Sequence, residues 1–295
     1  MKFAGIDIGS NAMRLLIGEV LETNNKVHVG KLSLVRLPVR LGSDVFDTGY
    51  ISPQKEIDFI NGIEAFRIIM NIHQVEGYKA FATSAMRNAI NGNEIVKKTF
   101  EKTGIEIEII DGDKEGETIL STFHLLTLDP NKPYLYIDVG GGSTEISLLI
   151  NGKSEINHSF NVGTVRLLSE KIPEGEWDAM LSWTDKVSEK YKPEFAIGTG
   201  GNINKLIKLC CQNNEMVLNV ELMRNIAEEM KDMTIQERMQ KWDLRSDRAD
   251  VIVHAAQIYL NVLEHVGISS IIVPKLGLAD GIIYNLYKNA IEVAG

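Results

Sequence analysis

Short hydrophobic runs recur along the chain and alternate with longer amphipathic segments. The runs have the composition and period of β-strands, and we expect strands at residues 3–8, 12–20, 27–39, 79–83, 105–110, 134–139, 144–150, 154–162, 195–199 and 270–274. In the segments between them, apolar residues recur every three or four positions, which predicts helices. This alternation indicates an α/β fold.

Two helices are predicted with particular clarity. Ser52 and Pro53 supply an N-cap and a first-turn proline for a helix that continues through residues 54–73. The segment 246–267 is more apolar, so we expect one long helix that is buried on most sides.

The chain contains an internal repeat. The stretch "FAGIDIGSNAMRLLIGEV" near the start matches "YLYIDVGGGSTEISLLI" in the middle, and Asp7 and Asp138 lie 138 − 7 = 131 residues apart. This spacing predicts duplicated domains. Because Asp-Pro and Lys-Pro pairs precede the second copy, we place the domains at 1–124 and 125–283, with the last helix, 284–295, returning to the first. A third glycine turn, at 196–206, follows a strand and opens a helix.

Composition excludes several classes of protein. The 295 residues carry a net charge of −9, which argues against a general DNA, RNA or membrane-surface binder. No hydrophobic run is long enough to cross a bilayer, and the first residues do not resemble a signal peptide. The only cysteines, Cys210 and Cys211, are neighbours and form no disulfide framework or four-ligand zinc site. We therefore expect a cytoplasmic protein.

The duplicated turns suggest phosphate chemistry. A turn of glycine and serine exposes main-chain N–H groups without side chains in the way, and such groups bind phosphate oxygens. Asp138 and Glu145 flank the second turn, and carboxylates of this kind hold Mg²⁺ together with substrate phosphates. The chain has neither a P-loop motif nor a Rossmann glycine pattern followed by a helix.

The layout of two hairpins with leading aspartates resembles the actin, Hsp70 and sugar-kinase superfamily. That resemblance implies an α/β fold of two duplicated actin-like (ribonuclease H-like) ATPase domains with an inter-domain cleft. One branch is more similar still, the exopolyphosphatase/guanosine pentaphosphate phosphatase family, in its short two-domain form. The motifs that carry this resemblance, in the expected order, are "GIDIGSNAMRLLI", "RLG", "ATSAMRNAIN", "DGDKEGE", "IDVGGGSTEISL", "NVGTVRL", "IGTGGNINKL", "RADVIV" and "GLADGII".

The resemblance assigns roles to individual residues. It implies that Glu115, which on its own is one more solvated charge in "DGDKEGE", is the base that activates water. It also implies a Mg²⁺ site formed by Asp138, Glu145 and Asp7. Phosphate is expected to contact ten residues, by main-chain N–H groups or side chains: Ser10, Asn11, Arg14, Arg87, Gly140, Gly141, Gly142, Ser143, Gly200 and Gly201. For Arg166, packing beside the second turn is as plausible as a phosphate contact.

Several positions depart from the family pattern. Lys114 stands where an acidic residue is usual, and Asn202 replaces a threonine. The usual Gly-Leu-Arg-Glu-Gly reads Gly-Leu-Ala-Asp-Gly at 277–281, so an arginine is absent at Ala279, and Lys275 is the nearest substitute for its charge. A Pro-Gly pair is replaced by His254 and Ala255, which we expect to straighten the long helix.

The function implied first is Mg²⁺-dependent hydrolysis of the terminal phosphate of polyphosphate. Hydrolysis of guanosine pentaphosphate (pppGpp) is the close alternative. A kinase or ATPase of the wider superfamily, and a non-catalytic binder of polyphosphate or guanosine penta- or tetraphosphate, also remain open. The family resemblance further implies a homodimer.

Overall fold

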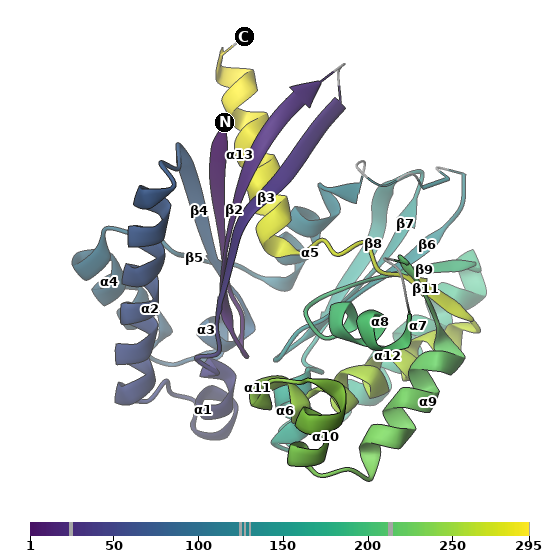
Figure 1. Cartoon of the computed structure of the whole chain (residues 1–295). Helices are drawn as coiled ribbons and strands as arrows, with labels where there is room; N and C mark the ends of the chain where they lie inside the picture. Colours follow the sequence, from purple (N-terminus) through teal and green to yellow (C-terminus); the bar gives the residue numbers. More distant parts are fainter. Residues whose placement is uncertain (24–25, 124–125, 127, 130, 212–214, 295) are drawn as a thin grey trace. The chain divides into compact units, whose positions relative to one another are not determined.

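The chain forms two compact units in the computed structural model, which describes residues 1–295 except 24–25, 124–125, 127, 130, 212–214 and 295 (Figure 1). Unit 1 comprises Met1–Leu126 and Gly277–Gly295, and unit 2 comprises Thr127–Leu276. The C-terminal segment that belongs to unit 1 therefore begins at Gly277, earlier than the residue 284 suggested by the sequence. Residues 124 and 125, between which the sequence places the domain boundary, lie outside the described residues.

Unit 1 is built on a five-stranded sheet with the order β3-β2-β1-β4-β5. The first three strands form an antiparallel meander, and β4 and β5 continue the sheet in parallel with β1. The strands are β1 (Lys2–Ile8), β2 (Met13–Thr23), β3 (Lys26–Leu37), β4 (Gly77–Ala82) and β5 (Glu108–Ile109). All five occupy segments that the hydrophobic pattern predicts as strands.

Helices cover both faces of this sheet. They are α1 (Leu41–Thr48), α2 (Pro53–Ile72), α3 (Ser84–Asn88), α4 (Gly92–Thr103), α5 (Gly112–Leu120) and α13 (Leu278–Ala294). A Cβ at Gly62 of α2 would lie 3.3 Å from the Met13 side chain, whereas one at Gly5 of β1 would lie 2.5 Å from the Ala279 carbonyl of α13. Because side chains alternate along a strand, these contacts place α2 and α13 on opposite faces.

The return of the chain to unit 1 completes part of its core. Phe3, Leu16 and Val20 from β1 and β2 are buried together with three residues of α13, namely Ala279, Ile283 and Tyr287. Gly5 is required at its position because the α13 backbone approaches it more closely than any side chain permits. The first and last elements of the chain thus share one hydrophobic cluster.

Unit 2 repeats the sheet of unit 1 and adds one strand. Its order is β10-β11-β9-β6-β7-β8, in which β6, β7 and β8 form the antiparallel meander and β9 and β11 run parallel to β6. The strands are β6 (Tyr134–Val139), β7 (Thr144–Ile150), β8 (Lys153–Phe160), β9 (Phe195–Thr199), β10 (Val217–Asn219) and β11 (Ser270–Ile272). The repeat in the sequence is therefore a repeat of topology.

Seven helices are described in unit 2. They are α6 (Thr164–Leu168), α7 (Glu176–Tyr191), α8 (Ile203–Cys210), α9 (Val220–Lys231), α10 (Ile235–Trp242), α11 (Ser246–Ala249) and α12 (Ile252–Val266). Helix α12 is buried along most of its length, with Ile258, Tyr259 and Val262 fully enclosed, as its apolar composition predicts. Among the described residues, no helix is both long and apolar enough to cross a membrane.

The expectation of one continuous helix over 246–267 is wrong. The helix is interrupted at Asp250 and Val251, between α11 and α12. The guanidinium group of Arg238 donates a hydrogen bond to the Ala249 carbonyl (3.0 Å), and the Val251 N–H bonds only three residues back, to Arg248 (3.2 Å). The tightened turn and the external donor end the first segment, and α12 then runs through His254 without a break.

Candidate active site

The two strand–turn–strand hairpins close in the same way. In the first turn, residues 9–12, the Gly9 N–H donates to the Ala12 carbonyl at 3.1 Å. In the second turn, residues 140–143, the Gly140 N–H donates to the Ser143 carbonyl at 2.9 Å. The N–H of Gly140 therefore closes its turn, and phosphate binding by Gly140 stays a prediction.

Three carbonyl groups of the second turn, those of residues 140 to 142, face one neighbouring segment. Those of Gly140 and Gly141 accept hydrogen bonds from the N–H groups of Thr164 (3.1 Å) and Val165 (2.8 Å), and the Gly142 carbonyl accepts from Nε of Arg166 (2.8 Å). In a trans peptide the C=O and N–H groups point in opposite directions. The N–H groups that follow, from residue 141 to residue 143, are thus directed away from α6.

Close packing maintains this arrangement. A Cβ at Gly163 would lie 2.5 Å from the Gly141 carbonyl oxygen, so only glycine fits between α6 and the second turn. Arg166 holds the turn from behind, in agreement with the packing role considered for it.

The first turn is supported by a different segment. The N–H of Gly42 donates to the Ser10 carbonyl (2.8 Å), and the N–H of Arg40 donates to the Asn11 carbonyl (3.2 Å). We call residues 40–42 the Arg40 loop. The geometry of the trans peptide directs the N–H groups of Asn11 and Ala12 away from this loop. Among the described residues, the buried hydroxyl of Ser10 has no hydrogen-bond partner.

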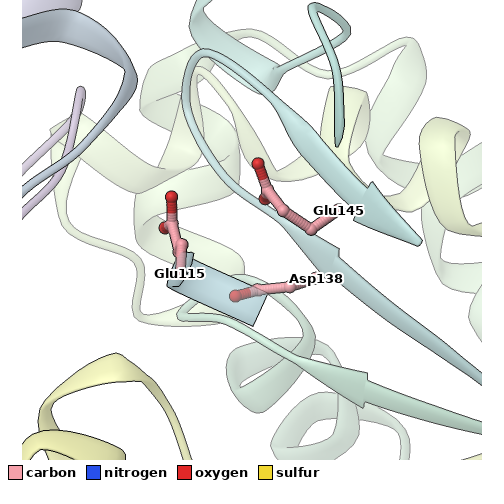
Figure 2. A group of neighbouring side chains, drawn as sticks. All are labelled: Glu115, Asp138 and Glu145. Atoms are coloured by element: carbon pink, nitrogen blue, oxygen red, sulfur yellow. The ribbon is translucent and has the colours of Figure 1, made fainter. Parts of the chain in front are cut away.

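Acidic side chains form a row across the sheet beside the second turn. Asp138 on β6 lies directly opposite Glu145 on β7, and Glu145 lies opposite Ser159 on β8. Paired residues on neighbouring strands project from the same face. Figure 2 labels Asp138 and Glu145 on their strands, and the Ser159 hydroxyl donates to the Glu145 carboxylate at 2.9 Å. We call these three residues the second row.

The corresponding row in unit 1 has the opposite charge. Asp7 on β1 lies opposite Arg14 on β2, which lies opposite Arg36 on β3, and we call these residues the first row. The guanidinium group of Arg14 is 2.6 Å from the Asp7 carboxylate. The first row thus has one carboxylate and two guanidinium groups, whereas the second has two carboxylates and no cation.

The third glycine loop approaches Asp138. Gly200 has a φ of 108°, and a Cβ there would lie 2.8 Å from the carboxylate oxygen Oδ1 of Asp138. Only glycine combines this backbone conformation with so close an approach. The next residue, Gly201, leads into α8, whose start is formed by hydrogen bonds from Lys205 and Leu206 to the Asn202 carbonyl. Asn202 thus serves the helix start through its main chain.

Two buried tyrosines connect the strand ends around Asp138. The Tyr259 hydroxyl donates to the Thr199 carbonyl (2.5 Å) and accepts from the Val139 N–H (3.3 Å), and the Tyr136 hydroxyl lies 2.9 Å from the Thr199 hydroxyl. Burial, reinforced by the charge of Asp138, raises the pKa of both tyrosines well above its ordinary value. They are therefore neutral hydrogen-bonding groups that join β6, β9 and α12.

Glu115 lies in the first turn of α5 in unit 1, and Figure 2 labels it. The helix begins at the N-cap Asp111, whose carboxylate accepts from the Lys114 N–H at 2.8 Å. Arg87 of α3 donates to the Ile110 carbonyl at 2.6 Å, just before this N-cap. Arg87 thus positions the helix that carries Glu115, a role that its spacing in the sequence does not reveal.

The departures from the family pattern have local explanations. Lys114 forms an ion pair within unit 1, with Glu108 of β5, which also pairs with Lys79 at 3.0 Å. Ala279 is buried against the sheet, while Asp280 forms an ion pair with Lys31 at 2.7 Å and accepts from the Gly277 N–H. Burial raises the pKa of Asp280, against the opposing effect of Lys31. Replacement of the family arginine by Lys275 stays a prediction.

Solved structures define the class of fold. The crystal structure of an exopolyphosphatase from Cytophaga hutchinsonii superposes with a TM-score of 0.85 at 23% identity, over 98% of both chains. A Ppx/GppA family member from Aquifex aeolicus gives a TM-score of 0.76 at 25% identity, also over 98% of both. The expected actin-like fold of two α/β domains is thereby confirmed.

Sequence comparison identifies the family. A model of the Ppx/GppA phosphatase family matches residues 23–290, and the chain belongs to this family. Exopolyphosphatase 1 of Mycobacterium tuberculosis is 26% identical over 304 residues, covering 96% of this chain and 87% of that protein. Guanosine-5′-triphosphate,3′-diphosphate pyrophosphatase of Aeromonas hydrophila is 24% identical, with coverages of 97% and 60%. A bifunctional 3-dehydroquinate synthase/phosphatase of Fusobacterium nucleatum is 29% identical over 92% of this chain but only 44% of its own length.

Proposed function

We propose that this protein hydrolyses the terminal phosphoanhydride bond of inorganic polyphosphate and releases orthophosphate. The observation that carries the proposal is the second hairpin, where Asp138 and Glu145 lie side by side next to a turn whose carbonyls at residues 140 to 142 are bonded from behind by α6. Bare main-chain donors and a pair of carboxylates suit a phosphate group with its counter-ion. The relatives named as exopolyphosphatases support the same substrate.

The N–H groups of Gly141, Gly142 and Ser143 are the donors we assign to phosphate in unit 2, with Gly200 and Gly201 beside them. In unit 1 we assign the first turn, Ser10 and Asn11 included, together with Arg14 and Arg87. The last two also bond within the protein, to Asp7 and to the Ile110 carbonyl, so each orients a protein group as well as the substrate. Phosphoryl transfer requires mainly such positioning and neutralisation of charge.

The carboxylates of the second row fit Mg²⁺. Asp138 and Glu145 offer carboxylate oxygens on one face of the sheet, and the Ser159 hydroxyl donates to Glu145. Mg²⁺ is usually held by one or two carboxylates, with substrate phosphates and water as its other ligands. When bound there, the ion would neutralise negative charge on the phosphate oxygens. For Asp7, whose carboxylate is bound to Arg14, a part in the metal site stays a prediction.

We assign activation of the attacking water molecule to Glu115. Its carboxylate would hold the attacking water molecule in line with the terminal phosphate and accept a proton from it. This step requires Glu115 of unit 1 and the second row of unit 2 to act on one phosphate group, which is part of the proposal.

The test is orthophosphate release from long polyphosphate, tripolyphosphate, pppGpp and ATP, with and without Mg²⁺. We expect Glu115→Gln to lower kcat about 100- to 10,000-fold, the usual contribution of a general base. Glu117→Gln is the matched control, because Glu117 is an exposed carboxylate on the same helix. Equal rates for Glu115→Gln and wild type would refute the assignment of the base.

Hydrolysis of pppGpp is the second candidate, favoured by the similarity to the Aeromonas hydrophila pyrophosphatase. Faster release from pppGpp than from polyphosphate would establish it. Turnover of ATP alone would indicate an ATPase or kinase of the wider superfamily, and binding without turnover a non-catalytic phosphate binder. A homodimer and a cytoplasmic location stay predictions.

A further inference from the structure

We infer that Arg40 is a substrate-binding residue that contacts a phosphate group held by the first turn, a group other than the one transferred. The inference rests on the proposed function and extends it to a specific side chain. The sequence motif "RLG" includes this arginine but gives it no role.

Arg40 has a backbone conformation that disfavours any residue with a side chain. Its φ of 58° and ψ of 46° are left-handed, where glycine is the usual residue. Strained positions of this kind persist where surrounding contacts hold them and often occur in binding sites. The contacts of the Arg40 main chain must therefore offset the cost of this conformation.

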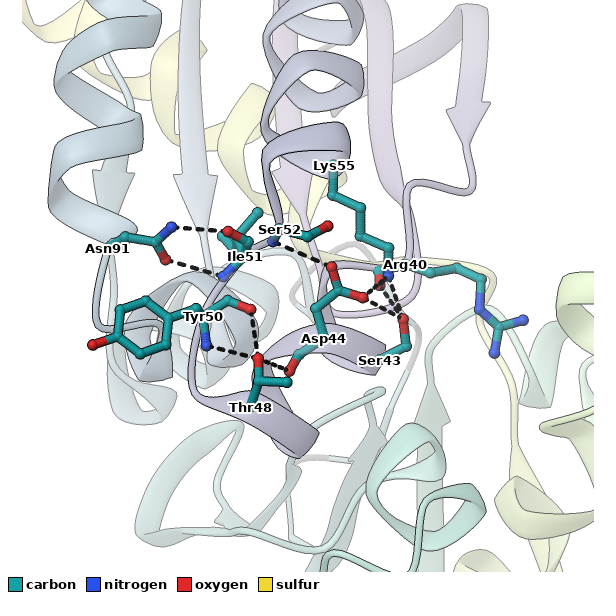
Figure 3. A network of polar contacts seen from close by, with 9 residues as sticks. All are labelled: Arg40, Ser43, Asp44, Thr48, Tyr50, Ile51, Ser52, Lys55 and Asn91. Carbon is teal, nitrogen blue, oxygen red and sulfur yellow. Dashed lines mark hydrogen bonds and ion pairs between the residues drawn. The ribbon is translucent and has the colours of Figure 1, made fainter.

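Both main-chain polar groups of Arg40 are anchored. Its N–H donates to the Asn11 carbonyl of the first turn. Its carbonyl accepts from the Ser43 hydroxyl (2.9 Å) and from the Lys55 ammonium (2.6 Å), as Figure 3 shows. The start of the side chain is therefore fixed relative to the turn that we assign to phosphate.

A second layer of contacts holds the anchors. The Lys55 ammonium lies 2.6 Å from the Asp44 carboxylate, which also accepts from the Ser52 N–H at 3.2 Å. Burial opposes ionisation of Asp44, but hydrogen bonds from Lys55 and Ser52 keep its pKa below the ordinary value. Figure 3 shows the Arg40 guanidinium group extending away from Lys55, Ser43 and Asp44. These three residues therefore hold the backbone from which the guanidinium group extends.

Comparison with the second turn indicates that the Arg40 side chain is not needed to support the first turn. There, Arg166 uses its guanidinium Nε to bind the Gly142 carbonyl. In the first turn the equivalent carbonyl, of Asn11, is satisfied by the main-chain N–H of Arg40. Support of the turn therefore does not require the Arg40 side chain.

The surroundings favour an anion as its ligand. The first row carries two guanidinium groups and one carboxylate, a net positive charge beside the same turn. The buried Ser10 hydroxyl, without a partner among the described residues, adds a hydrogen-bond donor to the turn. A guanidinium group binds phosphate oxygens through two parallel N–H groups, which gives Arg40 a defined ligand.

Contact with a phosphate group that does not react affects binding in the ground state and the transition state alike. Removal of the Arg40 side chain is therefore expected to raise KM and to leave kcat nearly unchanged. A contact with the transferred phosphate would instead lower kcat, so the two cases are distinguishable.

The decisive variant is Arg40→Gly, because glycine suits the left-handed backbone. We expect Arg40→Gly to melt at or above the wild-type temperature. It should raise KM for tripolyphosphate about 10-fold. Arg40→Lys keeps the charge but loses the paired guanidinium donors, so its KM should lie between those of wild type and Arg40→Gly. The matched control is Arg67→Gln, on α2 of the same unit, where the arginine pairs with Glu64 and is expected to leave KM unchanged. A lower melting temperature with unchanged KM would show that Arg40 is structural and would overturn the inference.

Binding measurements separate this inference from the proposed function. Calorimetric titration of tripolyphosphate into Glu115→Gln, with and without Arg40→Gly, needs no turnover. A weaker Kd with Arg40→Gly supports the inference even if wild type hydrolyses nothing. An unchanged Kd refutes it even if wild type is an active hydrolase.

Lys55 positions the backbone of Arg40 through its hydrogen bond to the Arg40 carbonyl. We expect Lys55→Met to raise KM for tripolyphosphate about threefold, with kcat retained and partial rescue by Lys55→Arg. Lys98→Met, at a surface ion pair of unit 1, is the control. A KM for Lys55→Met equal to that of Lys98→Met would remove Lys55 from the proposal.

Discussion

The two hairpins have the same register and opposite charge. Asp7 and Asp138 occupy equivalent positions, and each faces the residue seven positions ahead, Arg14 in the first case and Glu145 in the second. The first row therefore has a net charge of +1, and the second of −2. The repeat preserves the backbone of the turn, whereas the cross-strand partner of the aspartate differs.

This divergence suggests a division of labour. Because Arg14 binds the Asp7 carboxylate, this carboxylate adds no unbalanced negative charge near phosphate. Two adjacent carboxylates repel phosphate unless a cation lies between them. We therefore assign substrate anchoring to the first hairpin and the metal to the second.

Among the variants that test this division of labour, we expect the largest effect on kcat from replacing one of the two equivalent aspartates, Asp7 and Asp138. Asp138→Asn should lower kcat at least about 100-fold, because the metal supplies several kcal/mol of charge stabilisation. Asp7→Asn should act mainly on KM, by releasing Arg14. The measurement is orthophosphate release as a function of Mg²⁺ concentration for both variants. Equal losses of kcat would contradict the division of labour.

The supports behind the turns should respond differently to an added methyl group. Gly163→Ala would place a Cβ 2.5 Å from main-chain atoms of the second turn, which have nowhere to move. We expect a loss of about 3 kcal/mol in the free energy of unfolding, with lower activity. Gly42→Ala meets the Phe46 ring at 2.7 Å and Ser10 Cβ at 2.9 Å, and a ring can shift, so about 1 kcal/mol is expected.

Urea denaturation of both glycine variants measures this difference. Gly116→Ala is a control for stability, because a Cβ there meets no atom within 4 Å and alanine favours the helix. If Gly42→Ala proved the more damaging substitution, the first turn would be the more tightly packed of the two.

The smallest effect concerns pH. Asp44 stabilises the Arg40 loop, and its pKa lies below the ordinary 3.8 in the folded protein. A lowered carboxyl pKa contributes stability above the unfolded value, and this contribution disappears as pH falls through the folded value. Because solvent screens this partly exposed group, Asp44→Asn should cost only about 0.5 kcal/mol at pH 7, and the difference from wild type should shrink below pH 4. A difference that persists in acid would mean that Asp44 acts by packing.

The sequence predicted the hairpins because their signal is local. Asp7 and Asp138 each follow a hydrophobic strand and precede small residues, so the repeat and both turns could be inferred from neighbouring positions. The third glycine turn could be predicted in the same way, because it follows a hydrophobic strand and precedes α8. The family resemblance supplied Glu115, which composition alone does not distinguish from other acidic residues.

The supports of the turns could not be predicted in this way. Gly42 and Ser10 are 32 positions apart, and Gly163 differs from other glycines only by the backbone against which it packs. A left-handed arginine at residue 40 also has no local signal, since arginine carries no preference for this conformation. The interruption at Asp250 depends on Arg238, which lies on the preceding helix α10.

The shared cluster of β1, β2 and α13 has a consequence for synthesis of the protein. Phe3, Leu16 and Val20 leave the ribosome long before their partners Ile283 and Tyr287 are made. All of unit 2 is translated in between. At about 5–20 residues per second, this face of unit 1 stays uncovered for tens of seconds. Unit 2 can therefore complete its core first, although unit 1 holds the N-terminus, and the nascent chain exposes a hydrophobic surface that a chaperone can bind.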